Sequence, residues 1–251
     1  MTILLIDADI PCYKLGFANE EDIIFGEDSI IYSDFEALKR KMQAHIEILI
    51  EKTGSNKAFL AISDKDNFRK KVDKSYKGHR KDVRKPTHLA EIQEFLIDTY
   101  TVVRRPNIEA DDVIGILATH PDFNPGEEKI ICSIDKDLNQ IAGKHYNPDK
   151  DLHYEITDEE ALALFYTQIV CGDTADGYKG CKGIGKGKAA KLFEDCETDA
   201  EYWKITLDIF LKKEYTEDEV LVQARLARIL QYKDYDYDKK EPILWQPPIL
   251  K

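Results

Sequence analysis

Acidic residues recur in short groups along this sequence, and most of these groups follow a stretch that predicts a β-strand. The apolar run 3–6 ends at Asp7, and the predicted strand 57–62 is followed by Asp64. Parallel strands end at one edge of an α/β sheet, where ligands bind. We therefore expect these carboxylates to converge, although a solvated strand end is the alternative for any single one. The candidates are Asp7, Asp64, Glu109, Asp111, Asp112, Asp135, Asp137, Asp173 and Asp176.

Such a set of carboxylates predicts a particular metal chemistry. The six histidines and five cysteines show no ligand spacing. Oxygen ligands alone favour hard divalent ions, above all Mg2+, with Mn2+ as a substitute. Two such ions a few ångströms apart can activate a water and stabilise the leaving oxygen of a phosphodiester. For the acids at 109–112 a helix cap is a second explanation, but three acids in four positions exceed what a cap needs.

The stretch 171–191, CGDTADGYKGCKGIGKGKAAK, combines two aspartates with a glycine and lysine run. Glycines let a backbone approach a ligand closely, and a helix start offers free N–H groups to a phosphate. The pattern predicts a helix-hairpin-helix-like grip on a nucleic-acid backbone, and a glycine-rich turn with solvated lysines is the alternative. The residues of this grip are Lys182, Gly183, Gly185, Lys186, Gly187 and Lys188.

Charge is distributed unevenly along the chain. The formal net charge is -12, which at first argues against a nucleic-acid partner. A phosphate backbone responds to the local field, however, and residues 65–85 hold ten Lys or Arg against three acids. Phe68 and Tyr76 lie within this basic segment. A projecting basic loop with aromatic residues suits single-stranded nucleic acid, whereas a solvated charged loop is the simpler interpretation.

The pattern of apolar runs predicts an α/β fold with a mostly parallel central sheet flanked by helices. Strands are expected at 3–6, 57–62, 100–103 and 129–134, with a hairpin at 144–156. Helices are expected at 34–53, 87–98, 109–120, 157–170, 200–212 and 216–231. We expect an α/β domain over residues 1–165 and a helical domain over 166–251, which on the resemblance described below would be a nuclease domain and a DNA-binding domain. An odd number of cysteines without a CxxC pair, and no signal peptide or membrane-length run, predict a cytoplasmic protein.

Together, these pieces resemble the flap endonuclease and 5′ to 3′ exonuclease family, which includes bacteriophage 5′ nucleases and the 5′-nuclease domain of bacterial DNA polymerase I. The resemblance covers residues 3–191. One departure is DADIP, where relatives often have glycine after the first aspartate. The resemblance is carried by LLIDAD, ISDKDNFRK, YKGHRK, EADD, SIDKDL and GDTADG before GIGKGKAAKL.

The resemblance implies a role for each group. Asp7, Asp64, Glu109, Asp111 and Asp112 would hold a first Mg2+, and Asp135, Asp137, Asp173 and Asp176 a second. Lys77 and Arg80 would stand at the base of a basic helical arch around residues 65–100 and offset charge on the scissile phosphate. Tyr13 would stack on a terminal base, and the turn at 183–188 would bind duplex DNA and a K+ ion.

The resemblance also implies a reaction. A monomer would hydrolyse DNA at 5′ ends, flaps, and nicked or gapped duplex, in replication or repair, leaving 5′-phosphate and 3′-hydroxyl ends. Asp7, Asp64, Asp135 and Asp173, with Lys77 and Arg80, would carry the catalysis. If the source is viral, the host cytoplasm is the expected location.

Two other functions fit part of the pattern. A phosphatase of the haloacid dehalogenase type would use Asp7 as nucleophile and Asp9 as general acid, with GDTAD as its metal motif. It usually has Thr or Val where Pro11 stands, and it leaves EADD and GIGKGKAAK unused. A non-catalytic DNA-junction binding protein would need to keep nine acids near DNA without metal, where they would only repel phosphates.

Overall fold

A six-stranded sheet forms the centre of the molecule, in the order β5-β4-β1-β6-β7-β8. The computed structural model describes residues 1–26 and 28–250. All neighbouring strands of this sheet are parallel except β8, which runs antiparallel to β7. This arrangement confirms the predicted fold class. The strands are β1 (Thr2–Asp7), β4 (Lys57–Ala61), β5 (Val102–Val103), β6 (Glu128–Cys132), β7 (Gly143–Asn147) and β8 (Leu152–Ile156).

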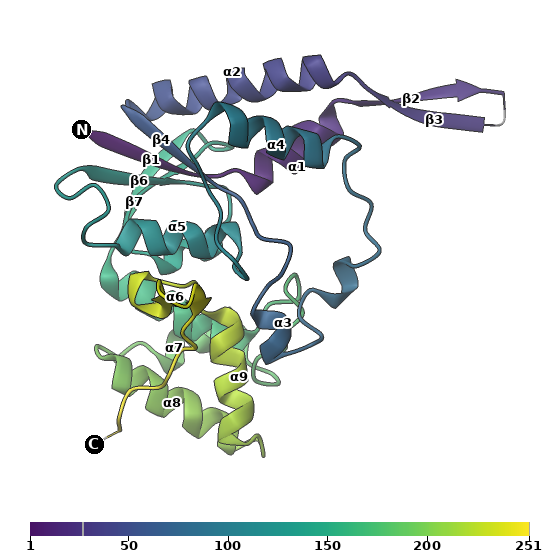
Figure 1. The fold of residues 1–251 in the computed structure, drawn as a ribbon. Helices are drawn as coiled ribbons and strands as arrows, with labels where there is room; N and C mark the ends of the chain where they lie inside the picture. Colours follow the sequence, from purple (N-terminus) through teal and green to yellow (C-terminus); the bar gives the residue numbers. More distant parts are fainter. Residues whose placement is uncertain (27, 251) are drawn as a thin grey trace.

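Helices cover both faces of the sheet (Figure 1). β1 supplies Ile3 and Leu5 to one apolar cluster and Leu4 and Ile6 to another, so its continuous apolar run is buried on both sides. The first cluster is completed by α5 (Ala110–Thr119). The second is completed by α1 (Asp9–Ala18), α2 (Phe35–Thr53) and α4 (Leu89–Thr99). The sheet therefore holds the end of β1 at a fixed place between two layers.

A two-stranded hairpin, β2 (Glu20–Phe25) paired with β3 (Asp28–Ser33), projects from the body between α1 and α2 (Figure 1). The sequence analysis did not anticipate it or α1. Ile24, Phe25 and Ile30 of the hairpin are exposed. Because this hairpin has almost no buried face, its sequence lacks the apolar and polar alternation that marks a half-buried strand.

The basic segment differs from the helical arch that the sequence analysis expected over residues 65–100. It contains one short helix, α3 (Arg69–Val72), and one 3-10 turn, η1 (Gly78–Arg80). The helix predicted at 87–98 is α4, which packs against the sheet and belongs to the α/β body. Phe68, Val72 and Tyr76 attach the first part of this segment to the apolar clusters, but residues 78–85 are all exposed. Because this second part has no face to bury, the basic segment crosses as a strap.

Four helices follow the sheet: α6 (Asp158–Cys171), α7 (Lys186–Leu192), α8 (Asp199–Leu211) and α9 (Glu217–Ala227). Three of them begin with a capping box at a threonine: Thr157, Thr198 and Thr216. They enclose an apolar cluster around Trp203 and Phe210.

The chain then returns to the α/β body. Ile229 and Leu230 join the apolar cluster beneath α5. The boundary predicted at residue 166 stays a prediction. In the described part of the chain, no helix is both long and apolar enough to cross a membrane. The remaining short elements are η2 (Lys136–Gln140), η3 (Tyr232–Asp234), β9 (Tyr235–Asp236) and β10 (Glu241–Pro242).

Candidate active site

Two neighbouring strands deliver acidic residues to the same edge of the sheet. Asp7 is the last residue of β1, and Asp135 follows the parallel neighbour β6. Ser133 links them, since its hydroxyl donates to Asp7 Oδ2 at 3.2 Å and accepts from the backbone N–H of Asp135 at 3.0 Å. Burial, followed by the charges of Asp9 and Asp135, raises the pKa of Asp7 to about 7. The strand ends thus hold carboxylates that oppose one another's ionisation.

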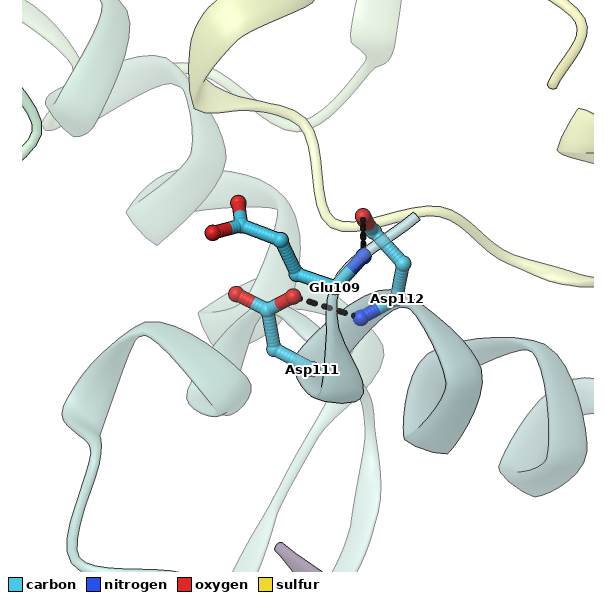
Figure 2. A group of neighbouring side chains, drawn as sticks. All are labelled: Glu109, Asp111 and Asp112. Atoms are coloured by element: carbon cyan, nitrogen blue, oxygen red, sulfur yellow. Dashed lines mark hydrogen bonds between the residues drawn. The ribbon is translucent and has the colours of Figure 1, made fainter. Parts of the chain in front are cut away.

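A second acidic group opens α5. Glu109, Asp111 and Asp112 each offer an oxygen, and these oxygens lie within 4.8 Å of one another. Figure 2 shows that the side chains of Glu109 and Asp111 lie together while that of Asp112 points away from them. Burial, followed by the charges of Asp112 and Glu109, raises the pKa of Asp111 well above its usual range. Glu109 and Asp111 therefore present their carboxylates together at the start of this helix.

Asp112 binds Arg69 instead of facing Glu109 and Asp111. Its side chain is fully buried, and Arg69 donates to both of its oxygens, from Nη1 at 2.6 Å and from Nη2 at 2.8 Å. The backbone N–H of Leu230 donates to Asp112 Oδ1 at 3.0 Å. Arg69 also donates to the carbonyl oxygens of Leu226 and Arg228. This network ties the basic segment and the end of α9 to α5.

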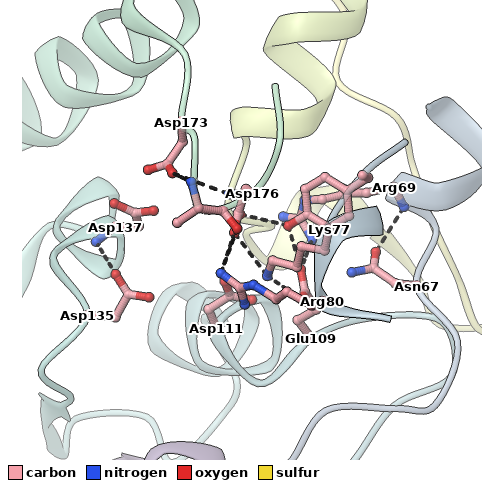
Figure 3. Close-up of polar contacts among 12 residues, drawn as sticks. Asn67, Arg69, Lys77, Arg80, Glu109, Asp111, Asp135, Asp137, Asp173 and Asp176 are labelled. Atoms are coloured by element: carbon pink, nitrogen blue, oxygen red, sulfur yellow. Dashed lines mark hydrogen bonds and ion pairs between the residues drawn. The ribbon is translucent and has the colours of Figure 1, made fainter. Parts of the chain in front are cut away.

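A third group gathers residues that follow β6 with residues of the loop between α6 and α7. Figure 3 shows Asp135, Asp137, Asp173 and Asp176 around one space, with Asp111 nearby. Burial, followed by the charges of Asp135, Asp173 and Asp176, raises the pKa of Asp137 to about 6. Asp137 Oδ1 is buried and has no hydrogen-bond partner among residues 1–26 and 28–250. An unsatisfied buried carboxylate oxygen is costly unless a cation or water occupies the space beside it.

Basic residues of the strap bridge the second and third groups. Lys77 Nζ lies 2.6 Å from Glu109 Oε1 and 3.4 Å from Asp176 Oδ1, and Arg80 Nη2 lies 3.4 Å from the same Asp176 oxygen. The Tyr76 hydroxyl lies within hydrogen-bond distance of Glu109 and Asp176. Burial would raise the pKa of Glu109, but the charges of Lys77 and Arg69 outweigh it and lower that pKa to about 2.

The acidic groups fit divalent cations. Their donors are all carboxylate oxygens, which hard cations such as Mg2+ prefer. A polar pocket of about 60 Å3 lies between Asp111, Asp135, Asp137 and Asp176. An open cleft of about 660 Å3 adjoins it and is bordered by Asp7, Asp9, Tyr13, Glu109, Asp111 and Asp135, together with the strap. The acids therefore lie along a cleft with room for a substrate larger than an ion.

Comparison with known proteins decides the family. Residues 2–166 match the model of the 5′-3′ exonuclease N-terminal resolvase-like domain. The chain belongs to the 5′-3′ exonuclease family. It is therefore a nuclease of the 5′-3′ exonuclease and flap endonuclease type, as the order of its acidic motifs predicts.

Relatives of this 5′-3′ exonuclease include bacteriophage nucleases. The exonuclease of Escherichia phage T7 is 29% identical over 225 residues, which covers 75% of this chain and 73% of the relative. The exodeoxyribonuclease of Enterobacteria phage T3 is 30% identical over 225 residues, covering 75% and 72%. The bacteriophage T5 flap endonuclease, solved with DNA and metal ions, has a TM-score of 0.68 at 14% identity, over 90% of this chain and 89% of that one. The likeness to the T5 protein shows a shared fold.

Two acids of this 5′-3′ exonuclease lie differently from what the resemblance implies: Asp9, named in the sequence analysis only for the phosphatase, borders the cleft, and Asp64 is not among the residues that border it. Asp64 pairs with Arg104 at 3.1 Å and accepts from the backbone N–H of Asn107 at 2.9 Å. Asp9, by contrast, borders the cleft and accepts from the backbone N–H of Ser63 at 3.2 Å. Burial raises the pKa of Asp9. The available signal was the spacing in DAD, which places two acids at the turn between β1 and α1.

The glycine and lysine turn lies on the surface of the 5′-3′ exonuclease. Lys182, Gly183 and residues 185–188 are exposed, and α7 begins at Lys186 and packs on α6. A β-carbon on Gly180 would lie 2.3 Å from the backbone nitrogen of Gly172, and one on Gly172 would lie 2.3 Å from the carbonyl carbon of Lys179. Only glycines allow this crossing of the loop, which fixes the turn against α6.

Ammonium groups face the carbonyl oxygens of this turn. Lys188 Nζ donates to the Gly183 carbonyl oxygen at 2.8 Å, and the Lys213 ammonium donates to the Lys182 carbonyl oxygen.

Tyr13, the predicted stacking residue, is 37% exposed and borders the cleft.

Proposed function

We propose that this 5′-3′ exonuclease hydrolyses phosphodiester bonds of DNA at 5′ ends and flaps with the aid of two Mg2+ ions, for which Mn2+ can substitute. One observation carries the proposal: two groups of carboxylates border one cleft and the polar pocket that adjoins it, and Asp137 keeps a buried oxygen without a partner within the described ranges. Bound Mg2+ supplies positive charge that activates a water and stabilises the leaving oxygen. We expect the products to carry 5′-phosphate and 3′-hydroxyl ends.

Two sets of residues would hold the ions. Asp7, Glu109 and Asp111, with Asp9 beside them, are proposed for the first. Asp135, Asp137, Asp173 and Asp176 are proposed for the second. Asp64 and Asp112, which the sequence analysis included in the first set, are proposed to act through Arg104 and Arg69, because their oxygens are already paired with those guanidinium groups.

The strap would bring positive charge to the scissile phosphate. Lys77 and Arg80 lie at the mouth of the acidic site and contact Asp176. With the carboxylates neutralised by bound cations, these two side chains would be free to contact a phosphate group and to stabilise its developing negative charge. Tyr13 borders the same cleft and offers a ring on which a base can stack.

The exposed turn would hold the duplex by its backbone. Lys182, Lys186 and Lys188 project there, and contacts of this kind position a strand without reading its sequence. A K+ ion at this turn would take the place of the ammonium group of Lys188 at the Gly183 carbonyl. We propose that the enzyme acts as a monomer in the cytoplasm, in DNA replication or repair.

A cleavage assay tests this function. Flap, nicked duplex and single-stranded DNA, each labelled at the 5′ end or internally, are incubated with Mg2+ or EDTA. Release of mononucleotides or intact flaps in Mg2+ alone is expected. Folded protein that cleaves none of them in Mg2+ or Mn2+ contradicts the proposal. Hydrolysis of small phosphate esters would then favour the phosphatase, and metal-independent junction binding without turnover the binding protein.

A further inference from the structure

A second hollow adjoins the catalytic cleft at Asp7. It is a cavity of about 160 Å3 at the carboxyl ends of β1 and β6. Four residues border both the cavity and the cleft: Asp7, Ile10, Lys14 and Ile134. On α1, Tyr13 and Phe17 face the cleft, whereas Pro11 and Leu15 face the cavity. Asp7 therefore stands between two hollows that open on adjoining faces of α1.

The cavity has mostly apolar walls with polar groups at its edge. Pro11, Leu15 and Leu49 line it, together with the buried Ser133. Lys14 and Asp149 form an ion pair of 2.6 Å at the rim, where both side chains are about half exposed. Such a lining suits a flat and weakly polar ring whose edge can form a few hydrogen bonds.

The size of the cavity limits the ring that it can hold. Engineered apolar cavities of about 150 Å3 take up benzene. A cavity of about 160 Å3 therefore admits a single six-membered ring, such as a pyrimidine base. A purine, with its second ring, would extend into the rim and contact Lys14 and Asp149.

The positions of the cleft and the cavity relative to the proposed duplex grip indicate which nucleotide would reach the cavity. A scissile phosphodiester has one nucleotide on each side. Because Asp7 borders both the cleft and the cavity, a phosphate bound beside Asp7 would have one hollow near each of these two nucleotides. The cleft is bordered by Lys77 and Arg80, which contact the loop between α6 and α7, so it lies on the side of the proposed duplex grip. The cavity lies toward α2, on the opposite side of the sheet from α7, α8 and α9 (Figure 1).

We propose that this cavity binds the unstacked base of the nucleotide on the 5′ side of the scissile bond, the nucleotide that cleavage releases, and that a pyrimidine fits it best. The inference rests on the proposed function, because it requires a phosphodiester at the acidic site. The base would reach the cavity past Ile10 and Ile134, which border it on the cleft side.

The test compares base removal with cavity filling. Duplexes whose 5′-terminal nucleotide is thymidine or an abasic residue are cleaved by the wild-type enzyme, by Leu15→Trp, which fills the cavity, and by Leu211→Trp. Leu211 is exposed on α8 and provides a matched control. The wild type and Leu211→Trp are expected to prefer thymidine by about tenfold in kcat/KM, the scale of one buried base contact. Leu15→Trp is expected to cleave both substrates at the same rate.

A binding measurement separates this inference from the proposed function. The same duplex carries 5-fluorodeoxyuridine at its 5′ terminus, and its 19F resonance is recorded with Ca2+, a hard cation that carboxylate oxygens also bind, so that the acidic site can accept a phosphate. If the wild type shifts the 19F resonance and Leu15→Trp returns it to its position in free DNA, the cavity binds the base. This conclusion holds even if no substrate is cleaved, because the absence of cleavage contradicts only the proposed function. Equal cleavage of thymidine and abasic termini by the wild type, or a 19F shift unaffected by Leu15→Trp, overturns the inference.

Discussion

Two adjacent acids of α5 are expected to respond in opposite ways when each is changed to asparagine. Asp112 neutralises the fully buried Arg69, whereas Asp111 is buried beside other carboxylates, and its pKa is raised by that burial and by Asp112 and Glu109. Asp112→Asn leaves the buried Arg69 guanidinium with only its longer contact, 3.3 Å, to Glu109 as counter-charge. Asp111→Asn removes a charge that the metal-free protein holds unfavourably. The first change should destabilise the fold, and the second should weaken metal binding.

The structure sets the scale of these effects. Breaking a buried ion pair by removing one partner costs about 3–5 kcal/mol. At about 2–4 °C per kcal/mol for a chain of this length, Asp112→Asn should lower Tm by roughly 6–20 °C in EDTA. Asp111→Asn should melt at or above the wild-type temperature in EDTA. Metal present at 100 times Kd stabilises the native state by about 2.7 kcal/mol. Asp112→Asn should keep this gain, and Asp111→Asn should lose most of it.

Thermal unfolding in EDTA and in Mg2+ measures both quantities for each variant. Arg69→Met combined with Asp112→Asn is the control, because removing both charges leaves none unpaired and should recover much of the lost stability. The reasoning is refuted if Asp112→Asn has the same Tm as the wild type in EDTA and its Tm no longer rises when Mg2+ is added. Asp112 would then be a metal ligand instead of the partner of Arg69.

Three further predictions follow from individual contacts. Lys188→Ala should weaken duplex binding and make the negative slope of log K against log salt concentration shallower by about 0.9. An unchanged slope in a binding titration would show that Lys188 does not contact the DNA backbone. Gly180→Ala should lower Tm, because its β-carbon would lie 2.3 Å from a backbone nitrogen; an unchanged Tm would contradict the tight crossing. Hydrogen bonds from Arg84 lower the pKa of Glu20 to about 2, so the stability that Glu20 adds should be present above about pH 5 and lost as the pH falls toward 2. The difference in unfolding free energy between the wild type and Glu20→Gln should therefore shrink as the pH falls from about 5 toward 2. A difference that stays constant over this range would contradict the ion pair.

Much of the site could be predicted because it depends on local patterns. A buried strand must be apolar, so the acid that ends it stands out, as Asp7 does after β1. The apolar periodicity of α5 and the acids at its first turn likewise placed Glu109 and Asp111 at a helix start. Parallel strand order then brings the ends of β1 and β6 together, which is how Asp7 and Asp135 become neighbours.

The direction of each side chain could not be predicted, because distant contacts decide it. Asp112 points away from the cleft because Arg69 and the backbone of Leu230 bind it, and these residues lie 43 and 118 positions away in the sequence. Asp64 pairs with Arg104, and Asp9 borders the cleft. Residue spacing specifies which backbone positions meet but does not include these long-range partners.

Cleavage by Asp135→Ala and Asp173→Ala, with DNA binding measured in parallel, tests the central claim most directly. These carboxylates belong to the group around the unpartnered oxygen of Asp137. A labelled 5′-flap substrate is incubated with each variant in Mg2+, and its affinity is measured in EDTA. The account predicts that both variants bind the flap with affinity close to wild type and that neither cleaves it. Normal turnover by both variants would contradict the assignment of these residues to a catalytic metal site.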